Sequence, residues 1–287
     1  MKVGKYEVGA GSPVFIIAEI GINHNGDLGI AKKLIKTASD AGCNAVKFQK
    51  RTIEIVYTTA ELANTRESPF GSTNGDLKRG LELTREMYVE IDRYCKELDI
   101  LWFASPWDER SVDFLEEFNV PCHKIAAACL TDAGLLKHIK STKKPIFMAT
   151  GMSELEEIDK AVALLDKDNL ILFHCTSLYP APPNKINLRR IHTLKERYKT
   201  LIGYSGHELD TVISSVAVGL GAVALERHLT LAREMWGSDQ NTSIVPVELI
   251  ELVHNIRTVE QALGSPTLTC LPEEVPVKEK LRRVNNI

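Results

Sequence analysis

The 287-residue sequence predicts an α/β fold in a single domain, a (β/α)8 TIM barrel. Eight short apolar runs alternate with segments of helical periodicity, and the runs are apolar throughout, as expected for parallel strands buried on both faces. Polar residues follow every run, whereas an open doubly wound sheet gathers them at one switch point. No G-x-G-x-x-G motif follows the first run. A closed barrel therefore explains the pattern better than an open sheet.

The apolar runs define the predicted strands and the segments between them the predicted helices. The strands cover residues 14–18, 44–48, 101–104, 122–126, 145–149, 170–173, 201–204 and 222–225. Asp27 and Thr84 are suitable N-caps for the first two long helices. Ser153 and Glu156 have the spacing of a capping box for a third helix. The other helices are predicted at 111–118, 131–140, 188–198, 210–220 and 247–263.

Two stretches fall outside the eight repeated units. Residues 51–80 are polar and show no clear period, and thirty residues are too many for a plain connector. We therefore expect a functional loop over the site. We assign residues 1–264 to the barrel with a short N-terminal extension, and residues 265–287 to a C-terminal extension packed on the surface.

Composition restricts the class of protein. The net charge is −3 and no run of basic residues occurs, so neither nucleic acid nor anionic lipid is an expected partner. No apolar stretch approaches the length of a membrane span. The six cysteines include no C-x-x-C pair, which favours reduced thiols and a cytoplasmic location.

Two histidines, His207 and His228, follow the last two predicted strands. Their separation of 21 residues is too large for one helix face. If the strands are parallel neighbours joined by the helix at 210–220, both imidazoles reach the same end of the sheet. Such a pair suits a divalent transition metal, with water and substrate completing the coordination. The alternative is two unrelated histidines, one capping a helix and one hydrogen-bonded in a core.

Two lysines, Lys47 and Lys124, sit next to apolar strand residues and are predicted to point into the barrel. A structural lysine would instead extend to solvent. With the hydroxyls of Ser105, Thr150 and Ser205, inward lysines would form a pocket for a phosphate or carboxylate. These residues belong to a larger ring of polar positions at strand ends. The other members are Glu19, Gln49, Ser177, Tyr179, His207, Glu226 and His228. His24 is interpreted as a turn residue and not as a third metal ligand.

Eight motifs resemble those of the sialic acid synthase family. They are AEIGINHNGD (18–27), VKFQ (46–49), KIAA (124–127), ATGM (149–152), CTSLYPAP (175–182), GYSGH (203–207), ERHLT (226–230) and GSDQ (237–240). The resemblance runs from about residue 12 to residue 264. It implies an N-acetylneuraminate synthase-like enzyme, which condenses phosphoenolpyruvate with an amino-sugar aldehyde to a nine-carbon 2-keto-3-deoxy acid.

The resemblance also implies roles for individual residues. By position, His207 and His228 would bind a divalent metal. The expected ion is Mn²⁺, and Mg²⁺ or Co²⁺ are alternatives. Lys47, Lys124 and Ser205 would hold phosphoenolpyruvate. Gln49 and Tyr179 would lie close to the substrates, Glu19 beside the reacting carbons and Asp239 near the acceptor sugar. A homodimer is expected as well.

The sequence departs from the family at Ala127, Cys129 and Gln240, where a serine, a glutamate and a histidine are usual. We also expect the family's second, antifreeze-like domain to be absent. If the strand carrying Lys124 continues regularly, Cys129 replaces a carboxylate that grips sugar hydroxyls. We therefore expect N-acetylmannosamine to be a poor acceptor. Two alternatives remain open: the same chemistry on an aldose without the N-acetyl group, giving an octulosonate-like acid, and a non-catalytic sugar- or phosphate-binding relative.

Overall fold

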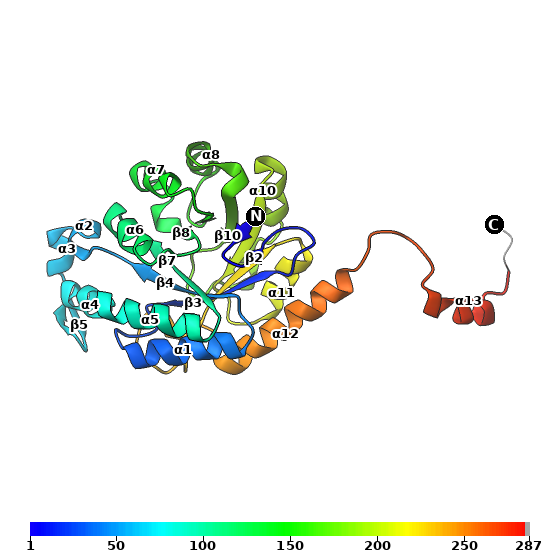
Figure 1. The fold of residues 1–287 in the computed structure, drawn as a ribbon, viewed down its shortest axis with the longest axis horizontal. Helices are drawn as coiled ribbons and strands as arrows, with labels where there is room; N and C mark the ends of the chain where they lie inside the picture. The colour runs from blue at the N-terminus through cyan, green and yellow to red at the C-terminus, as the bar shows by residue number, and fades with distance from the viewer. Residues whose placement is uncertain (285–287) are drawn as a thin grey trace.

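Eight parallel strands form the centre of the computed structural model, which describes residues 1–284 (Figure 1). They are β3 (Phe15–Gly21), β4 (Ala45–Lys50), β7 (Leu101–Pro106), β8 (His123–Ile125), β9 (Ile146–Ala149), β10 (Leu170–Cys175), β11 (Leu201–Gly206) and β12 (Ala224–His228). Their order is β7-β4-β3-β12-β11-β10-β9-β8, and β7 and β8 lie side by side at the closure. The predicted barrel is therefore confirmed.

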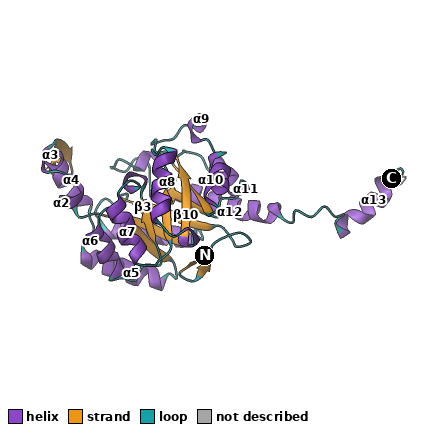
Figure 2. Cartoon of the chain, turned by 90° about the horizontal axis from the view of Figure 1, so that it is seen from above, coloured by secondary structure: helices purple, strands orange, loops and turns teal. Residues whose placement is uncertain are grey.

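Helices surround the strands and carry the chain from each strand to the next (Figure 2). They are α1 (Leu28–Asp40), α5 (Arg85–Glu97), α6 (Glu109–Glu116), α7 (Ala133–Ser141), α8 (Leu155–Leu164), α10 (Arg190–Tyr198), α11 (Val212–Gly219) and α12 (Pro246–Leu263). A short hairpin of β1 (Lys2–Val3) and β2 (Tyr6–Glu7) precedes the barrel, and α9 (Pro183–Ile186) follows β10. The apolar stripe of each long helix faces the sheet, which explains the helical period in the sequence.

Aromatic residues fill the lower part of the barrel. The Phe147 ring lies 6.0 Å from Phe15, 5.6 Å from Phe103 and 5.5 Å from Phe173, measured between ring centroids. Side chains alternate along a strand, so the next inward positions toward the carboxyl ends lie one layer higher. On β7 that position is Ser105, and the Lys124 ammonium lies 4.8 Å from the centre of the Phe173 ring. The aromatic layer therefore lies directly beneath the polar residues at the carboxyl ends of the strands.

The predicted helix starts are partly confirmed. The Asp27 carboxylate accepts a hydrogen bond from Ile30 N at 2.8 Å, and the Thr84 hydroxyl accepts one from Met87 N at 3.3 Å. The predicted capping box at Ser153 and Glu156 is misplaced by one residue. Helix α8 begins at Leu155, and Glu154 N donates to the Glu157 carboxylate at 2.8 Å. Ser153 instead donates to the carbonyl of Gly151.

The segment 51–80, where the sequence shows no clear period and we expected a functional loop, is built from short helices and a hairpin. It contains α2 (Ile53–Val56), α3 (Thr59–Ala63), the hairpin of β5 (Thr65–Ser68) and β6 (Gly71–Thr73), and most of α4 (Asn74–Leu81). Two capping boxes, Thr58 with Glu61 and Thr73 with Asp76, fix the starts of α3 and α4. These elements are too short to show a hydrophobic period, which is why the pattern missed them.

The C-terminal stretch also differs from expectation. Helix α12 ends at Leu263, and residues 265–284 are exposed to solvent along their whole length. They carry α13 (Val275–Leu281) away from the barrel instead of packing on it (Figure 1). The last three residues of the predicted extension, 285–287, lie outside the described residues. Within residues 1–284, no helix combines the length and apolarity required to cross a membrane.

Candidate active site

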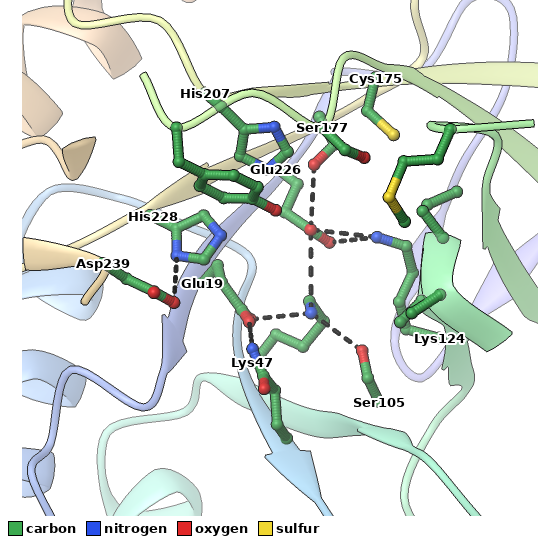
Figure 3. Close-up of a pocket in the computed structure, with 18 of the residues that line it drawn as sticks. Glu19, Lys47, Ser105, Lys124, Cys175, Ser177, His207, Glu226, His228 and Asp239 are labelled. Atoms are coloured by element: carbon green, nitrogen blue, oxygen red, sulfur yellow. Dashed lines mark hydrogen bonds and ion pairs between the residues drawn. The ribbon is translucent and has the colours of Figure 1, made fainter. Parts of the chain in front are cut away.

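A cavity of about 280 Å³ opens at the carboxyl ends of the strands. It is lined by all the predicted site residues except Thr150. Those that line it are Glu19, Lys47, Gln49, Ser105, Lys124, Tyr179, Ser205, His207, His228 and Asp239. The chemistry-bearing side chains predicted from separate strands therefore face one chamber (Figure 3).

Two lysines and two glutamates form a buried quartet at the bottom of the cavity (Figure 3). Lys124 Nζ donates to both oxygens of Glu226, at 3.0 and 2.9 Å. Lys47 Nζ lies 2.9 Å from Glu19 Oε2 and 3.8 Å from Glu226 Oε1, and it donates to Ser105 Oγ at 3.0 Å. The quartet balances its charges internally, so an incoming anion meets lysines that are already oriented.

The two carboxylates of the quartet have different proton affinities. Burial opposes ionisation of Glu226, but Lys124 and Lys47 outweigh it and lower its pKa to about 2. Burial raises the pKa of Glu19 to about 7, with repulsion from Glu226 adding to the shift and Lys47 only partly offsetting it. One carboxylate is therefore fixed as an anion, while the other exchanges its proton near neutral pH.

The two imidazoles, from the ends of β11 and β12, meet next to the quartet and nearer the carboxyl ends of the strands, with ring centroids 5.4 Å apart. His207 Nδ1 lies 2.8 Å from the carbonyl oxygen of Thr176, which can only accept, so Nδ1 carries the proton and Nε2 is free to bind a metal. Burial, with repulsion from His228, lowers the pKa of His207 to about 4, so the ring is neutral at pH 7.

His228 supplies the second half of this pair. Its Nδ1 is buried without a hydrogen-bond partner among the described residues, and Asp239 Oδ2 lies 3.9 Å away. Two neutral imidazoles with a nearby carboxylate fit a divalent ion. Within residues 1–284, no group of three or more His, Cys, Asp or Glu side chains has metal-binding geometry. Substrate or water would therefore have to complete the coordination.

Tyr179 forms a wall over both imidazoles. Its ring centroid lies 4.3 Å from that of His207 and 6.0 Å from that of His228. Half of the side chain remains exposed, and burial of the rest raises the pKa of the phenol. The hydroxyl is therefore protonated at neutral pH and available as a donor at the cavity mouth.

Three sequence expectations about the site are wrong. Thr150 is buried outside the cavity and donates to the carbonyl of Phe173 at 3.0 Å, so it is not a pocket hydroxyl. The chain leaves the strand after Ile125 and forms the 3₁₀ turn η1 (Ala127–Cys129), which removes the regular alternation on which the assignment of Cys129 depended. Ala127 lines the cavity, whereas Cys129 does not.

The third concerns the segment 51–80, which contributes no residue to the cavity lining. It lies beside the site instead, where the Phe70 ring packs 6.0 Å from Trp236 in the loop that leads to Asp239. His24, by contrast, is a turn residue as interpreted. Its Nδ1 accepts a hydrogen bond from Gly26 N at 3.0 Å.

Glu226 has a role that its position in the sequence did not reveal: it bonds Lys124 and accepts from Ser205 Oγ at 3.1 Å. Strand alternation could have found it, because Glu226 stands two residues before His228 and shares its inward face. Trp107 and Met152 also line the cavity, but they come from loops and carry no periodic signal.

Comparison with known proteins gives consistent matches over most of the chain. Residues 34–267 match the model of the NeuB family. The chain is 40% identical over 279 residues to N-acetylneuraminate-9-phosphate synthase of Homo sapiens, covering 96% of this chain and 78% of that protein. It is 35% identical over 285 residues to N,N'-diacetyllegionaminic acid synthase of Legionella pneumophila, covering 96% and 80%. The crystal structure of an N-acetylneuraminic acid (sialic acid) synthetase from Leptospira borgpetersenii superposes with a TM-score of 0.86 at 32% identity, covering 99% and 98%.

Proposed function

The chain belongs to the NeuB family, and from that membership we propose that it condenses phosphoenolpyruvate with a sugar aldehyde to a 2-keto-3-deoxy acid of the nonulosonic type, releasing phosphate. Its relatives are synthases of such acids. The single observation that carries the proposal is the meeting of a lysine–glutamate quartet and a histidine pair in one cavity. The quartet suits the anionic substrate and the pair suits the aldehyde.

Phosphoenolpyruvate would bind on the quartet side. Its phosphate and carboxylate need cationic and hydroxyl donors, which Lys47, Lys124 and Ser205 supply from three strands. Ser105, bonded to Lys47, adds a further hydroxyl beside the Lys47 ammonium. Because Glu226 already holds the Lys124 ammonium in place, little rearrangement is required before the substrate anion binds.

The sugar aldehyde would bind between this side and the imidazoles. A divalent ion held by His207 and His228 would act as a Lewis acid toward the aldehyde oxygen. The preferred ion is Mn²⁺, with Mg²⁺ or Co²⁺ as alternatives. Asp239 and Tyr179 flank the pair and can orient hydroxyl groups of the sugar. The neutral state of His207 leaves a lone pair free for this role.

Glu19 would act on the reacting carbons. The nucleophilic carbon of phosphoenolpyruvate attacks the aldehyde carbon, and water then adds at C2, where positive charge develops. An ionised Glu19, held by Lys47 and by Gln49 Nε2 at 3.3 Å, can stabilise that charge and accept a proton from the water. Collapse at C2 expels phosphate with cleavage of the C–O bond.

We favour an amino-sugar aldehyde as the acceptor. The expectation that N-acetylmannosamine is a poor acceptor depended on Ala127 and Cys129, and Cys129 lies outside the cavity. What remains is an apolar wall of small side chains at 126–128 next to Met152 and Trp107. Such a wall accommodates an acyl group better than it selects against one.

A homodimer is part of the proposal. Helix α11 is apolar nearly all round, and Val212 and Val216 are exposed on it. A helix with this composition is usually covered. Leu268 and Leu281 in the C-terminal stretch are also exposed apolar residues, and they too favour contact with a second subunit. Sedimentation velocity measures the oligomeric state directly.

The test of the proposed function is a phosphate-release assay with phosphoenolpyruvate, Mn²⁺ and a panel of aldoses. N-acetylmannosamine and its 6-phosphate are compared with mannose and arabinose at matched concentrations. Phosphate release that requires both the metal and an amino-sugar aldehyde is the expected result. Turnover with mannose or arabinose alone would favour the octulosonate-like alternative, and no release with any aldose would favour a binding protein.

A further inference from the structure

A buried hydrogen-bond network lies behind the two imidazoles, on the outer face of the strands that carry them. Its centre is Arg227, which is 2% exposed. The guanidinium donates to Glu208 Oε1 at 3.1 Å, to Ser214 Oγ at 2.8 Å and to the carbonyl of Asp210 at 2.8 Å. It also donates to the carbonyl oxygen of Glu208. One side chain of β12 thereby holds the whole turn that follows β11.

The carboxylate of Glu208 is equally well held. It accepts from Tyr204 Oη at 2.7 Å and from Ser214 Oγ at 2.7 Å, in addition to Arg227. The carboxylate folds back beneath Gly206, where an added Cβ would lie 2.6 Å from both of its oxygens. Glycine at this position therefore leaves the space that the carboxylate occupies.

The network connects directly to the imidazole pair through the backbone. Arg227 precedes His228, Glu208 follows His207, and Arg227 is the register partner of Gly206 across the β11–β12 ladder. Because side chains alternate, Arg227 points outward while His228 points into the cavity. We propose that the Arg227–Glu208 pair, here called the clamp, is a positioning device that fixes the spacing of His207 and His228 and thereby sets the affinity for a divalent ion. This inference rests on the proposed metal role of the histidines.

A purely structural role is a weaker explanation for the clamp. Desolvation largely offsets the attraction in a buried ion pair, so replacing both partners with uncharged groups of similar volume costs less stability than removing one of them. Removing only one partner leaves an unpaired buried charge and is strongly destabilising. A double variant can therefore remove the clamp from a folded protein, and metal affinity can be measured apart from stability.

The test compares the double variant Arg227→Met/Glu208→Gln with a second pair of the same chemistry. Arg257 and Glu260 bond each other at 2.8 Å on α12, and Arg257 also bonds the carbonyl of Val14 near the start of β3, at the other end of the barrel from the cavity. Arg257→Met/Glu260→Gln is the matched control. The dissociation constant for Mn²⁺ is measured by electron paramagnetic resonance on the metal-free proteins, and that for phosphoenolpyruvate by calorimetry.

We expect the clamp variant to bind Mn²⁺ about tenfold more weakly, the lower end of the range for residues that orient metal ligands. Its phosphoenolpyruvate affinity without metal should stay within about twofold of wild type, and the control should bind Mn²⁺ as wild type does. Unchanged Mn²⁺ affinity in the clamp variant would overturn the inference. A wild-type protein that binds no Mn²⁺ would overturn the proposed metal site itself.

Gly206→Ala provides a second route if the double variant fails to fold. The added methyl group must displace the Glu208 carboxylate while Arg227 and both histidines stay in the chain. Weaker Mn²⁺ binding by a folded Gly206→Ala protein supports the clamp. Affinity equal to that of wild type argues that the spacing of the imidazoles does not depend on it.

Discussion

Glu19 and Glu226 are both fully buried, yet only Glu19 exchanges its proton near physiological pH. Burial and the nearby Glu226 raise the pKa of Glu19 to about 7. If the ionised form assists water addition, kcat/KM should rise with pH along a limb centred near pH 7. The Glu19→Gln variant should be much slower and should lack this limb. A pH–rate profile measured for both proteins checks this, and the same limb in the variant would assign it to another group.

Lys124 is the lysine most completely engaged by Glu226. Lys124→Met should weaken phosphoenolpyruvate binding by about 1.5–3 kcal/mol, the usual contribution of a hydrogen bond to a charged group, or about 10- to 150-fold. The KM of the aldehyde should change much less. Lys50→Met is the matched control, because Lys50 pairs with Glu82 outside the cavity. Equal weakening of both substrates would refute the assignment of Lys124 to the phosphoenolpyruvate side.

At the scale of elements, Asp108 joins helix α6 to the start of the segment 51–80. Its carboxylate, 3% exposed, accepts from Ser111 N and Thr52 N at 2.9 and 2.7 Å and from both of their hydroxyls. Asp108→Ala leaves these donors unpaired and should lower the free energy of unfolding by about 3 kcal/mol. Asp27→Ala, an exposed cap with one bond, should cost about 1 kcal/mol. Urea denaturation measures both, and equal costs would contradict the role of Asp108.

The strands were predictable from sequence, but their ends were not. Apolar runs locate all eight strands, yet β12 continues to His228 and β3 to Gly21, each three residues beyond the end of the predicted run. The ladder continues because backbone bonds do not depend on side-chain polarity, and the polar residues there face a cavity. This extension places Glu226 and His228 on one inward face.

Local irregularities of the backbone account for most of the other differences between the predicted and the observed site. The turn at Ala127–Cys129 ends the alternation after Ile125, and no residue in KIAAACL signals where the strand stops. Thr150 follows an apolar run like the other site residues, but its hydroxyl bonds a backbone carbonyl. In both cases hydrogen bonds to the backbone determine where the side chain points, and the composition of the sequence does not reveal those bonds.

For the whole molecule, buried neutral histidines are a source of instability in acid. Burial lowers the pKa of His24 to about 4, and burial also lowers the pKa values of His123, His174 and His207. The unfolded chain takes up these protons near pH 6.5, whereas the folded state does not, so the stability that the four histidines contribute is complete above pH 6.5 and is lost as pH falls toward 4. Glu19 offsets part of this loss, because its raised pKa of about 7 lets the folded state take up a proton before the unfolded chain does. His24 alone should cost about 2 kcal/mol at pH 5.

Urea denaturation of the metal-free protein at pH 7.5 and pH 5.0 measures this loss. His24→Asn should reduce it, because the asparagine oxygen can accept the Gly26 hydrogen bond without titrating. A wild-type protein equally stable at both pH values would contradict the prediction. So would a His24→Asn variant that loses as much stability as wild type.

The central claim is that the cavity joins phosphoenolpyruvate to a sugar aldehyde with cleavage of the C–O bond. The most direct measurement uses phosphoenolpyruvate that carries ¹⁸O in the oxygen bridging C2 and phosphorus, with ³¹P NMR of the phosphate released during turnover with Mn²⁺ and an amino-sugar aldehyde. We predict that the phosphate retains the ¹⁸O and forms only when the aldehyde is present. Phosphate without the label, or phosphate formed equally well without aldehyde, would contradict this account.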